Sequence, residues 1–117
     1  MTLNFGIIGC GRIAQRHAEH LKNTTGSNLI AVCDVEKTKA DYLGNKYSAN
    51  IYYCIDDLLK NSAVDIVSIC SPNGLHAEHS IESLNAGLHV LCEKPMAIST
   101  YDCGEMIKAE EKANKRL

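Results

Sequence analysis

The chain has 117 residues, 45% of them hydrophobic and 22% charged, which is the composition of one ordinary globular domain and argues against a disordered or fibrous chain. Twelve Lys and Arg against fourteen Asp and Glu give a formal net charge of −2, so neither a nucleic-acid partner nor a membrane surface is expected. With no apolar run of about 18 residues and no signal-peptide pattern, the sequence predicts a cytoplasmic location.

Short apolar runs rich in β-branched residues recur along the chain. Such runs are typical of strands that are buried on both faces of a parallel sheet. They lie at residues 5–8, 29–33, 66–70 and 88–92, with a weaker candidate at 51–53 that is expected nearer an edge of the sheet.

Segments with helical periodicity separate these strands. Small and apolar residues share a helix face at Ala14, Ala18 and Leu21, at Ala40, Leu43 and Tyr47, and at Ala77, Ile81 and Leu84. Gly87 is placed as a helix C-terminal glycine. Residues 99–102 predict the capped start of a last helix, with Met106 and Ile107 facing inward.

Strands and helices that alternate in this way predict an α/β fold. The expected architecture is a doubly wound parallel sheet of the Rossmann type with three layers, α/β/α. We expect residues 1–117 to form one dinucleotide-binding domain. Because the sequence stops after a helix, where such a sheet usually continues, a fragment or a cut at a domain boundary is also expected.

Cysteine and histidine patterns provide candidates for disulfides and metal sites. None of the six cysteines forms a CxxC pair, so buried free thiols are preferred to disulfides or zinc. The pairs His17/His20 and His76/His79 have a metal-like spacing on a helix, but neither comes with a third ligand, and no metal is expected.

A glycine-rich turn follows the first predicted strand. Residues 9–14 read GCGRIA, which is G-x-G-x-x-A at the start of a helix. Gly9 allows the tight turn, Gly11 lets the backbone approach a pyrophosphate, and Ala14 lets the helix pack on the sheet. Free N–H groups at the helix start would receive the phosphates. Arg12 either adds charge beside them or is an exposed side chain without a specific role.

Asp34 follows the second predicted strand, 20 residues after Ala14. A carboxylate at this position accepts hydrogen bonds from the adenosine ribose and repels a 2′-phosphate, so NAD is favoured over NADP. The alternative is a structural role in which Asp34 caps the next helix.

Two further stretches at predicted strand ends carry a family resemblance. Residues 70–79 read CSPNGLHAEH and residues 91–97 read LCEKPMA. Together with the GCGRIA turn they resemble the N-terminal domain of the glucose–fructose oxidoreductase, inositol dehydrogenase and MocA family (Gfo/Idh/MocA). The sequence of these three stretches is most similar to that of family members that act on nucleotide-linked sugar uronates, such as UDP-N-acetylglucosaminuronate 3-dehydrogenases. Relatives commonly carry a small hydroxyl residue and an acid where this chain has Tyr53 and Cys54.

The resemblance implies a function for individual residues. It assigns Gly9, Gly11, Arg12 and Ile13 to the pyrophosphate turn, Asp34 to the adenosine ribose, Ser71, Asn73 and His76 to the loop beside the nicotinamide, and Glu93 and Lys94 to the E-K-P pair. In the family, the lysine of this pair lies beside the nicotinamide and the sugar hydroxyl, and Pro95 is often preceded by a cis peptide bond. The implied reaction is hydride transfer between NAD and a CH–OH group of a sugar or nucleotide sugar.

Lys94 is the candidate catalytic residue, because an ammonium group can polarise a carbonyl oxygen, stabilise a developing alkoxide or relay a proton. The alternative is an ordinary solvated surface lysine. The family's second, substrate-binding domain has no counterpart in these 117 residues. The expected partners are a sugar or nucleotide-sugar substrate and, at full length, further copies of the chain.

Two other functions remain open. A non-catalytic NAD sensor on the same fold would use the same glycine turn and would not need Lys94. An S-adenosylmethionine-dependent methyltransferase also has a doubly wound sheet and an acid after the second strand, but those enzymes more often show an acid before a G-x-G-x-G run.

Overall fold

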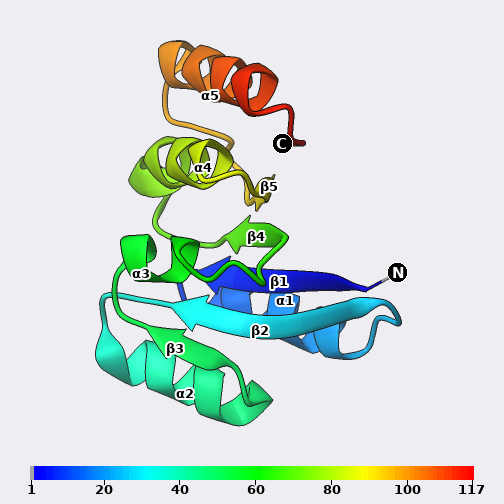
Figure 1. Ribbon diagram of the computed structural model, residues 1–117. Helices are drawn as coiled ribbons and strands as arrows, with labels where there is room; N and C mark the ends of the chain where they lie inside the picture. The colour runs from blue at the N-terminus through cyan, green and yellow to red at the C-terminus, as the bar shows by residue number, and fades with distance from the viewer. Residues whose placement is uncertain (1) are drawn as a thin grey trace.

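Five strands form one sheet in the computed structural model, which describes residues 2–117 (Figure 1). They are β1 (Leu3–Ile8), β2 (Ser27–Cys33), β3 (Asn50–Tyr52), β4 (Ile66–Ile69) and β5 (His89–Cys92). The strand order is β3-β2-β1-β4-β5 and every neighbouring pair is parallel. The predicted doubly wound parallel sheet is therefore confirmed; residue 1 of the predicted domain lies outside the described residues.

Helices cover both faces of the sheet (Figure 1). They are α1 (Arg12–Lys22), α2 (Lys37–Tyr47), α3 (Ile55–Leu59), α4 (His76–Asn85) and α5 (Thr100–Ala113), with a 3₁₀ turn η1 (Asn73–Leu75) before α4. One face carries α1 and α2, the other carries α3 and α4, and α5 packs alongside α4. Within residues 2–117, no helix has both the length and the apolar character that crossing a bilayer requires.

The sheet separates two hydrophobic cores, because successive side chains of a strand point to opposite faces. Ile7 packs with Ala14, Ala18 and Leu43 in the core under α1 and α2. Its neighbour Ile8 packs in the other core, where the residues from the helical side include Leu58, Leu84 and Ala109. Strands with apolar residues on both faces are thus the cause of the three-layer arrangement.

The helix ends largely agree with the sequence pattern. Gly87 has φ +88°, the left-handed conformation expected of a helix C-terminal glycine. Ser99 Oγ accepts a hydrogen bond from the Asp102 N–H at 3.1 Å and so caps α5.

The prediction that Met106 and Ile107 both face inward is half wrong. Met106 is fully buried, whereas Ile107 is 46% exposed and Ala109 takes the second buried position. Consecutive residues of a helix are about 100° apart around its axis, so only one of two neighbours can point at the centre of a narrow contact. Helix α3 was not anticipated from the sequence, because one short turn leaves too few residues for a periodic signal.

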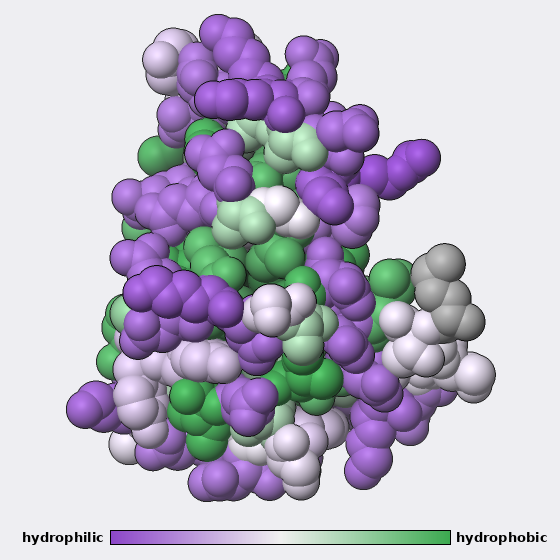
Figure 2. Space-filling view, viewed as in Figure 1, coloured by the Kyte–Doolittle hydropathy of each residue, from purple (hydrophilic) through white to green (hydrophobic). Residues whose placement is uncertain are grey.

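Strand β5 lies at one edge of the sheet, and the last residues of the chain run beside it. The carbonyl oxygen of Arg116 accepts a hydrogen bond from the Val90 N–H at 2.8 Å, and the Arg116 N–H donates to His89 Nδ1 at 3.0 Å. Leu91 of this strand is 51% exposed. In the view of Figure 2, hydrophobic residues (green) gather in the middle of the face and hydrophilic residues (purple) border them.

Candidate functional site

All the predicted site residues lie at one edge of the sheet. Gly9 follows β1, Asp34 follows β2, Ser71 follows β4, and Glu93 and Lys94 follow β5. Because the strands are parallel, their carboxyl ends meet at the same edge. The strand order reverses between β1 and β4, and ligands of open α/β sheets bind in the crevice outside such a switch point.

Gly9 is required where the turn after β1 meets the end of β4. Its φ of +92° is a conformation that side chains with a Cβ disfavour. A Cβ on Gly9 would lie 2.5 Å from the backbone N of Ser71 and 2.6 Å from the carbonyl carbon of Cys70. The Gly9 N–H donates to the carbonyl oxygen of Cys33 at 2.8 Å. The turn is therefore fixed against both neighbouring strands.

The start of α1 offers free backbone donors and open space. Gly11 is the N-cap residue, with no side-chain cap, and the first turn contains no acidic residue. A Cβ built on Gly11 would meet nothing within 4 Å. Arg12 and Ile13 are exposed there, whereas Ala14 is fully buried against the sheet. This end of α1 accordingly fits a phosphate group, whose oxygens would accept hydrogen bonds from the free N–H groups of the first turn.

Asp34 holds the glycine turn from the end of β2. Its Oδ2 accepts a hydrogen bond from the Cys10 N–H and its Oδ1 accepts one from the Glu36 N–H, both at 2.8 Å. Glu36 is the N-cap residue of α2 and no side chain caps this helix, so Asp34 holds the residue that precedes the helix and does not itself cap it. Each carboxylate oxygen can accept more than one hydrogen bond, so capacity for a ligand hydroxyl remains.

An apolar cavity of about 220 Å³ lies beside Asp34. It is lined by Ile8, Gly9, Cys33, Asp34, Val35, Cys54, Ile55, Ser71, Pro72, Leu75 and His79. Cys54 thus borders the cavity, while the Tyr53 hydroxyl points to α2 and donates to Asp41 Oδ1 at 2.6 Å. An apolar cavity with a carboxylate at its margin suits an aromatic ring that carries a polar substituent.

Two histidines of α4 form hydrogen bonds to the loop that follows β4. His76 is 1% exposed, and its Nδ1 and Nε2 lie 2.7 Å from the Pro95 carbonyl oxygen and 2.8 Å from the Ser71 carbonyl oxygen. His79 Nδ1 lies 2.8 Å from Ser71 Oγ, and burial lowers the pKa of His79. Asn73 is exposed at the start of η1. His76 therefore joins the loop after β4 to the turn after β5.

The turn after β5 is held by contacts on each side of Lys94. Glu93 Oε1 lies 2.9 Å from His17 Nε2 of α1, and Glu93 Oε2 accepts the Lys94 N–H at 3.1 Å. The hydrogen bond from His17 is the main cause that lowers the pKa of Glu93. The Lys94–Pro95 peptide bond is cis, as the resemblance implied. The Lys94 side chain is exposed, and within residues 2–117 its Nζ has no hydrogen-bond partner.

His17 was not predicted as part of this site. Its spacing to His20 pointed only to a weak metal candidate, and no local pattern relates a residue of α1 to a residue that follows β5. Residues 2–117 contain no group of three or more His, Cys, Asp or Glu side chains arranged to hold a metal ion. His17, His76 and His79 instead bond to protein groups of the site.

The six cysteines are free thiols, as the absence of a CxxC pair predicted. Burial raises the pKa values of Cys10, Cys33 and Cys70 to about 12, so these thiols are uncharged at neutral pH. Cys54 differs from the prediction of buried thiols because it is exposed at the margin of the apolar cavity.

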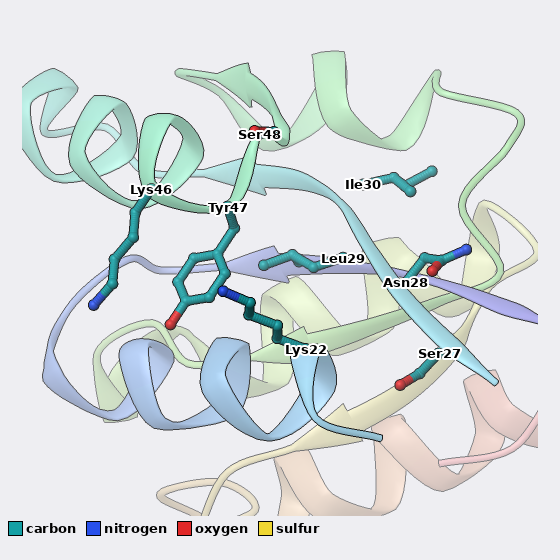
Figure 3. A pocket seen from close by; sticks show the side chains of 8 residues that line it. All are labelled: Lys22, Ser27, Asn28, Leu29, Ile30, Lys46, Tyr47 and Ser48. Carbon is teal, nitrogen blue, oxygen red and sulfur yellow. The ribbon is translucent and has the colours of Figure 1, made fainter. Parts of the chain in front are cut away.

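A groove of about 500 Å³ lies at the opposite edge of the sheet. Figure 3 shows its lining side chains, which come from the end of α1, the start of β2 and the end of α2 and include Lys22, Lys46 and Tyr47. It is larger than the cavity beside Asp34, but it lies at the amino ends of the strands, away from the glycine turn. The predicted site residues lie at the other edge, at the carboxyl ends of the strands, where ligands of open α/β sheets bind.

Comparison with known proteins identifies the family of this chain. The family described as "Oxidoreductase family, NAD-binding Rossmann fold" matches residues 3–117. The inositol 2-dehydrogenase of Salmonella typhimurium is 39% identical over 120 residues, which cover all of this chain and 36% of the relative. The D-glucoside 3-dehydrogenase of Escherichia coli is 38% identical over 98% of this chain and 33% of its own length.

Among solved structures, the WlbA dehydrogenase from Bordetella pertussis in complex with NADH and UDP-GlcNAcA superposes with a TM-score of 0.95 at 31% identity. That alignment covers 100% of this chain and 37% of the WlbA chain. The chain thus spans roughly a third of the length of the relatives it matches. With the family matched from residue 3 to residue 117, and with the glycine turn, Asp34 and the E-K-P turn at one sheet edge, the chain belongs to the Gfo/Idh/MocA family of oxidoreductases with an NAD-binding Rossmann fold.

Proposed function

We propose that this domain binds NAD and serves an enzyme that transfers a hydride between the cofactor and a CH–OH group of a sugar or nucleotide sugar. The observation that carries the proposal is the uncapped, open start of α1 beside Asp34, at the same sheet edge as the Lys94 turn. A site with free backbone donors, a carboxylate and an apolar cavity matches the phosphate, ribose and ring parts of a dinucleotide.

The cofactor would be held by residues from each strand end. The N–H groups after Gly11 would receive the pyrophosphate, with Arg12 and Ile13 beside it, and Asp34 would accept the ribose hydroxyls. Ser71, Asn73 and His76 would form the loop beside the nicotinamide. Asp34 favours NAD over NADP because its carboxylate would repel a 2′-phosphate. The nearby Lys39 ammonium is paired with Glu36 at 2.6 Å, which reduces its availability to such a phosphate.

Lys94 would act on the hydroxyl oxygen of the substrate. When bound, the nicotinamide ring accepts or donates the hydride. The Lys94 ammonium would stabilise negative charge that develops on the reacting oxygen, or donate a proton to it in the reverse direction. Glu93 would fix the Lys94 backbone through the hydrogen bond at 3.1 Å, which leaves the long side chain free to reach the substrate.

The substrate class is proposed from the relatives. One relative is an inositol 2-dehydrogenase and another is a D-glucoside 3-dehydrogenase. The structure of WlbA contains NADH and UDP-GlcNAcA. All three are longer than this chain. We therefore propose that the sugar is selected by a second domain in a full-length protein. We also propose that the full-length protein is a homo-oligomer.

The first test is a calorimetric titration of the chain with NADH, NADPH and S-adenosylmethionine in parallel. We expect NADH to bind more tightly than NADPH, and S-adenosylmethionine not to bind. Tighter binding of S-adenosylmethionine would overturn the proposal in favour of a methyltransferase. If none of the three binds to a chain whose amide-exchange pattern shows it to be folded, the glycine turn of this domain is structural.

A second test separates an enzyme from an NAD sensor on the same fold. In a full-length protein, Lys94→Ala should reduce turnover far more than it reduces NAD affinity, since Lys94 would act on the reacting oxygen. A sensor would tolerate the substitution without any loss of function. Equal turnover in the two proteins would remove Lys94 from the mechanism.

A further inference from the structure

A histidine of α1 reaches across the sheet edge to the turn that contains Lys94. His17 lies in the second turn of the helix whose start fits the pyrophosphate, and its Nε2 lies 2.9 Å from Glu93 Oε1. Their side chains are 16% and 26% exposed, so the pair is partly buried. Such a pair is stronger than one on an open surface, because solvent screens it less.

Both oxygens of Glu93 are used, and they connect different parts of the molecule. Oε1 meets His17, and Oε2 accepts the Lys94 N–H at 3.1 Å. The Glu93 N–H donates to the carbonyl oxygen of Ile69 at 3.0 Å, which fixes the Glu93 backbone to β4. The carboxylate is thus a bridge between a rigid helix and the peptide group of Lys94, and its orientation depends on His17.

The groups that face this pair determine its charge. Lys94 is the cation next to Glu93, and both His17 and Lys94 lower the pKa of Glu93, which keeps it ionised. The thiols of Cys70 and Cys92 also lie near Glu93, and burial raises the pKa of each, so they contribute no charge at neutral pH. An imidazole is the side-chain type among these whose charge ordinarily changes between about pH 5 and about pH 8.

We propose that His17 is a positioning residue for Lys94, which acts through the Glu93 carboxylate and links the pyrophosphate-binding helix to the reacting side chain. The proposal rests on the function proposed above for Lys94. A protonated His17 would form an ion pair with the Glu93 carboxylate, where an uncharged imidazole forms only a hydrogen bond to it, and would draw Glu93 Oε1 towards α1. The Lys94 peptide, bonded to the other oxygen, responds to this change. The position of the turn that contains Lys94 is thereby coupled to the position of the helix whose start would bind the phosphates.

The test is a titration followed by amide NMR of the ¹⁵N-labelled chain between about pH 5 and about pH 8, the range in which histidine ionises. We expect the Lys94 N–H resonance to shift with the same midpoint as the His17 ring. In His17→Ala this inflection should disappear. In His17→Gln, whose amide nitrogen can occupy the position of Nε2, the Lys94 resonance should stay near its high-pH position and should not titrate.

The matched control is His20→Ala, because His20 is an exposed histidine of the same helix and no hydrogen bond of its side chain occurs within residues 2–117. It should leave the Lys94 titration intact. A Lys94 resonance that titrates as before in both His17 variants would overturn the proposal. So would an equal loss in His20→Ala, since that would indicate a general effect of charge on α1.

Turnover of a full-length protein provides the second measurement. If the proposal is right, His17→Ala should lower kcat about tenfold, with the affinity for NADH changed less than about twofold, and His17→Gln should restore most of kcat. One outcome is that Lys94→Ala keeps full turnover although the Lys94 N–H resonance of the native chain titrates with His17. In that case the proposed function of Lys94 fails, and the coupling between His17 and the Lys94 peptide stands. If Lys94→Ala is inactive and the His17 variants change neither the resonance nor kcat, the link fails.

Discussion

The carboxylate of Asp34 and the peptide N–H of Cys10 are joined by a hydrogen bond of 2.8 Å, so the residue expected to bind the ribose also shapes the turn expected to bind the phosphates. The second oxygen of Asp34 holds the Glu36 N–H at the start of α2. The structural role of Asp34 and the ligand-binding role proposed for it therefore fall on one side chain, and a substitution at this position is expected to change both.

Asp34→Asn should weaken both stability and NADH binding. An amide presents only one acceptor oxygen, so one of the two hydrogen bonds is lost and the other loses its charge, at a cost of about 1–3 kcal/mol. Thermal unfolding measures the stability and calorimetry the affinity, with Glu111→Gln on the exposed side of α5 as control. An Asp34→Asn protein that prefers NADPH to NADH at unchanged stability would confirm the electrostatic role and contradict the structural one.

The two glycines of the turn should respond differently to alanine. In Gly9→Ala the Cβ would collide with the Ser71 backbone at 2.5 Å in a left-handed conformation, so we expect a loss of about 2–4 kcal/mol of stability. In Gly11→Ala the Cβ meets no protein atom within 4 Å, so stability should change by less than about 1 kcal/mol.

Gly11→Ala should nevertheless lower NADH affinity about tenfold or more, because its Cβ occupies the space through which a pyrophosphate approaches. Urea unfolding and calorimetry on the two variants provide the comparison. If Gly11→Ala binds NADH normally, the phosphates do not lie at the start of α1.

The cysteines should react with a thiol reagent in an order that follows burial. Cys54 is exposed and should react first, whereas Cys10, Cys33 and Cys70 are buried, with pKa values raised to about 12, and should react only when the chain unfolds. Mass spectrometry of partially modified protein identifies the sites. NADH should slow the modification of Cys54, which lines the apolar cavity, and should leave the reaction of Cys103 unchanged.

The His17–Glu93 pair should make stability depend on pH in the acid range. The pKa of Glu93 is lower in the folded chain than its ordinary value, so its ionised form stabilises the fold above the unfolded value of about 4.3. This contribution is lost as the pH falls through the folded value. The difference in unfolding free energy between the native chain and Glu93→Gln should therefore shrink as the pH falls below about 4.3 and through the lower value of the folded chain. An unchanged difference would mean that the pair does not form in solution.

Much of the fold could be predicted because the strongest signals are local. Apolar strand runs, Gly87 and the Ser99 cap depend on neighbouring residues, and the structure agrees with each of them. Ile107 could not be placed correctly, because a helix with one narrow contact face buries Met106 and turns its neighbour to solvent.

The contacts of the candidate site were predictable only in part. The placement of Asp34, Ser71 and Lys94 at one edge of the sheet could be predicted. Each of them follows a strand, and the carboxyl ends of parallel strands meet at the same edge. The His17–Glu93 pair joins residues 76 positions apart, and the burial of His76 beneath two loops depends on how α4 packs. Such relations follow from tertiary packing and have no signature in the local sequence.

The bond between Val90 and Arg116 at the rim of the sheet has a practical consequence for handling the protein. An unpaired strand edge is a template on which another chain can add a strand and begin to aggregate. Residues 115–117 run along the outer side of β5 and take up part of that edge. Changes that pull these residues away, such as a short deletion or a rigid tag fused after Leu117, should therefore lower the concentration at which the protein stays monodisperse, even where the core is untouched.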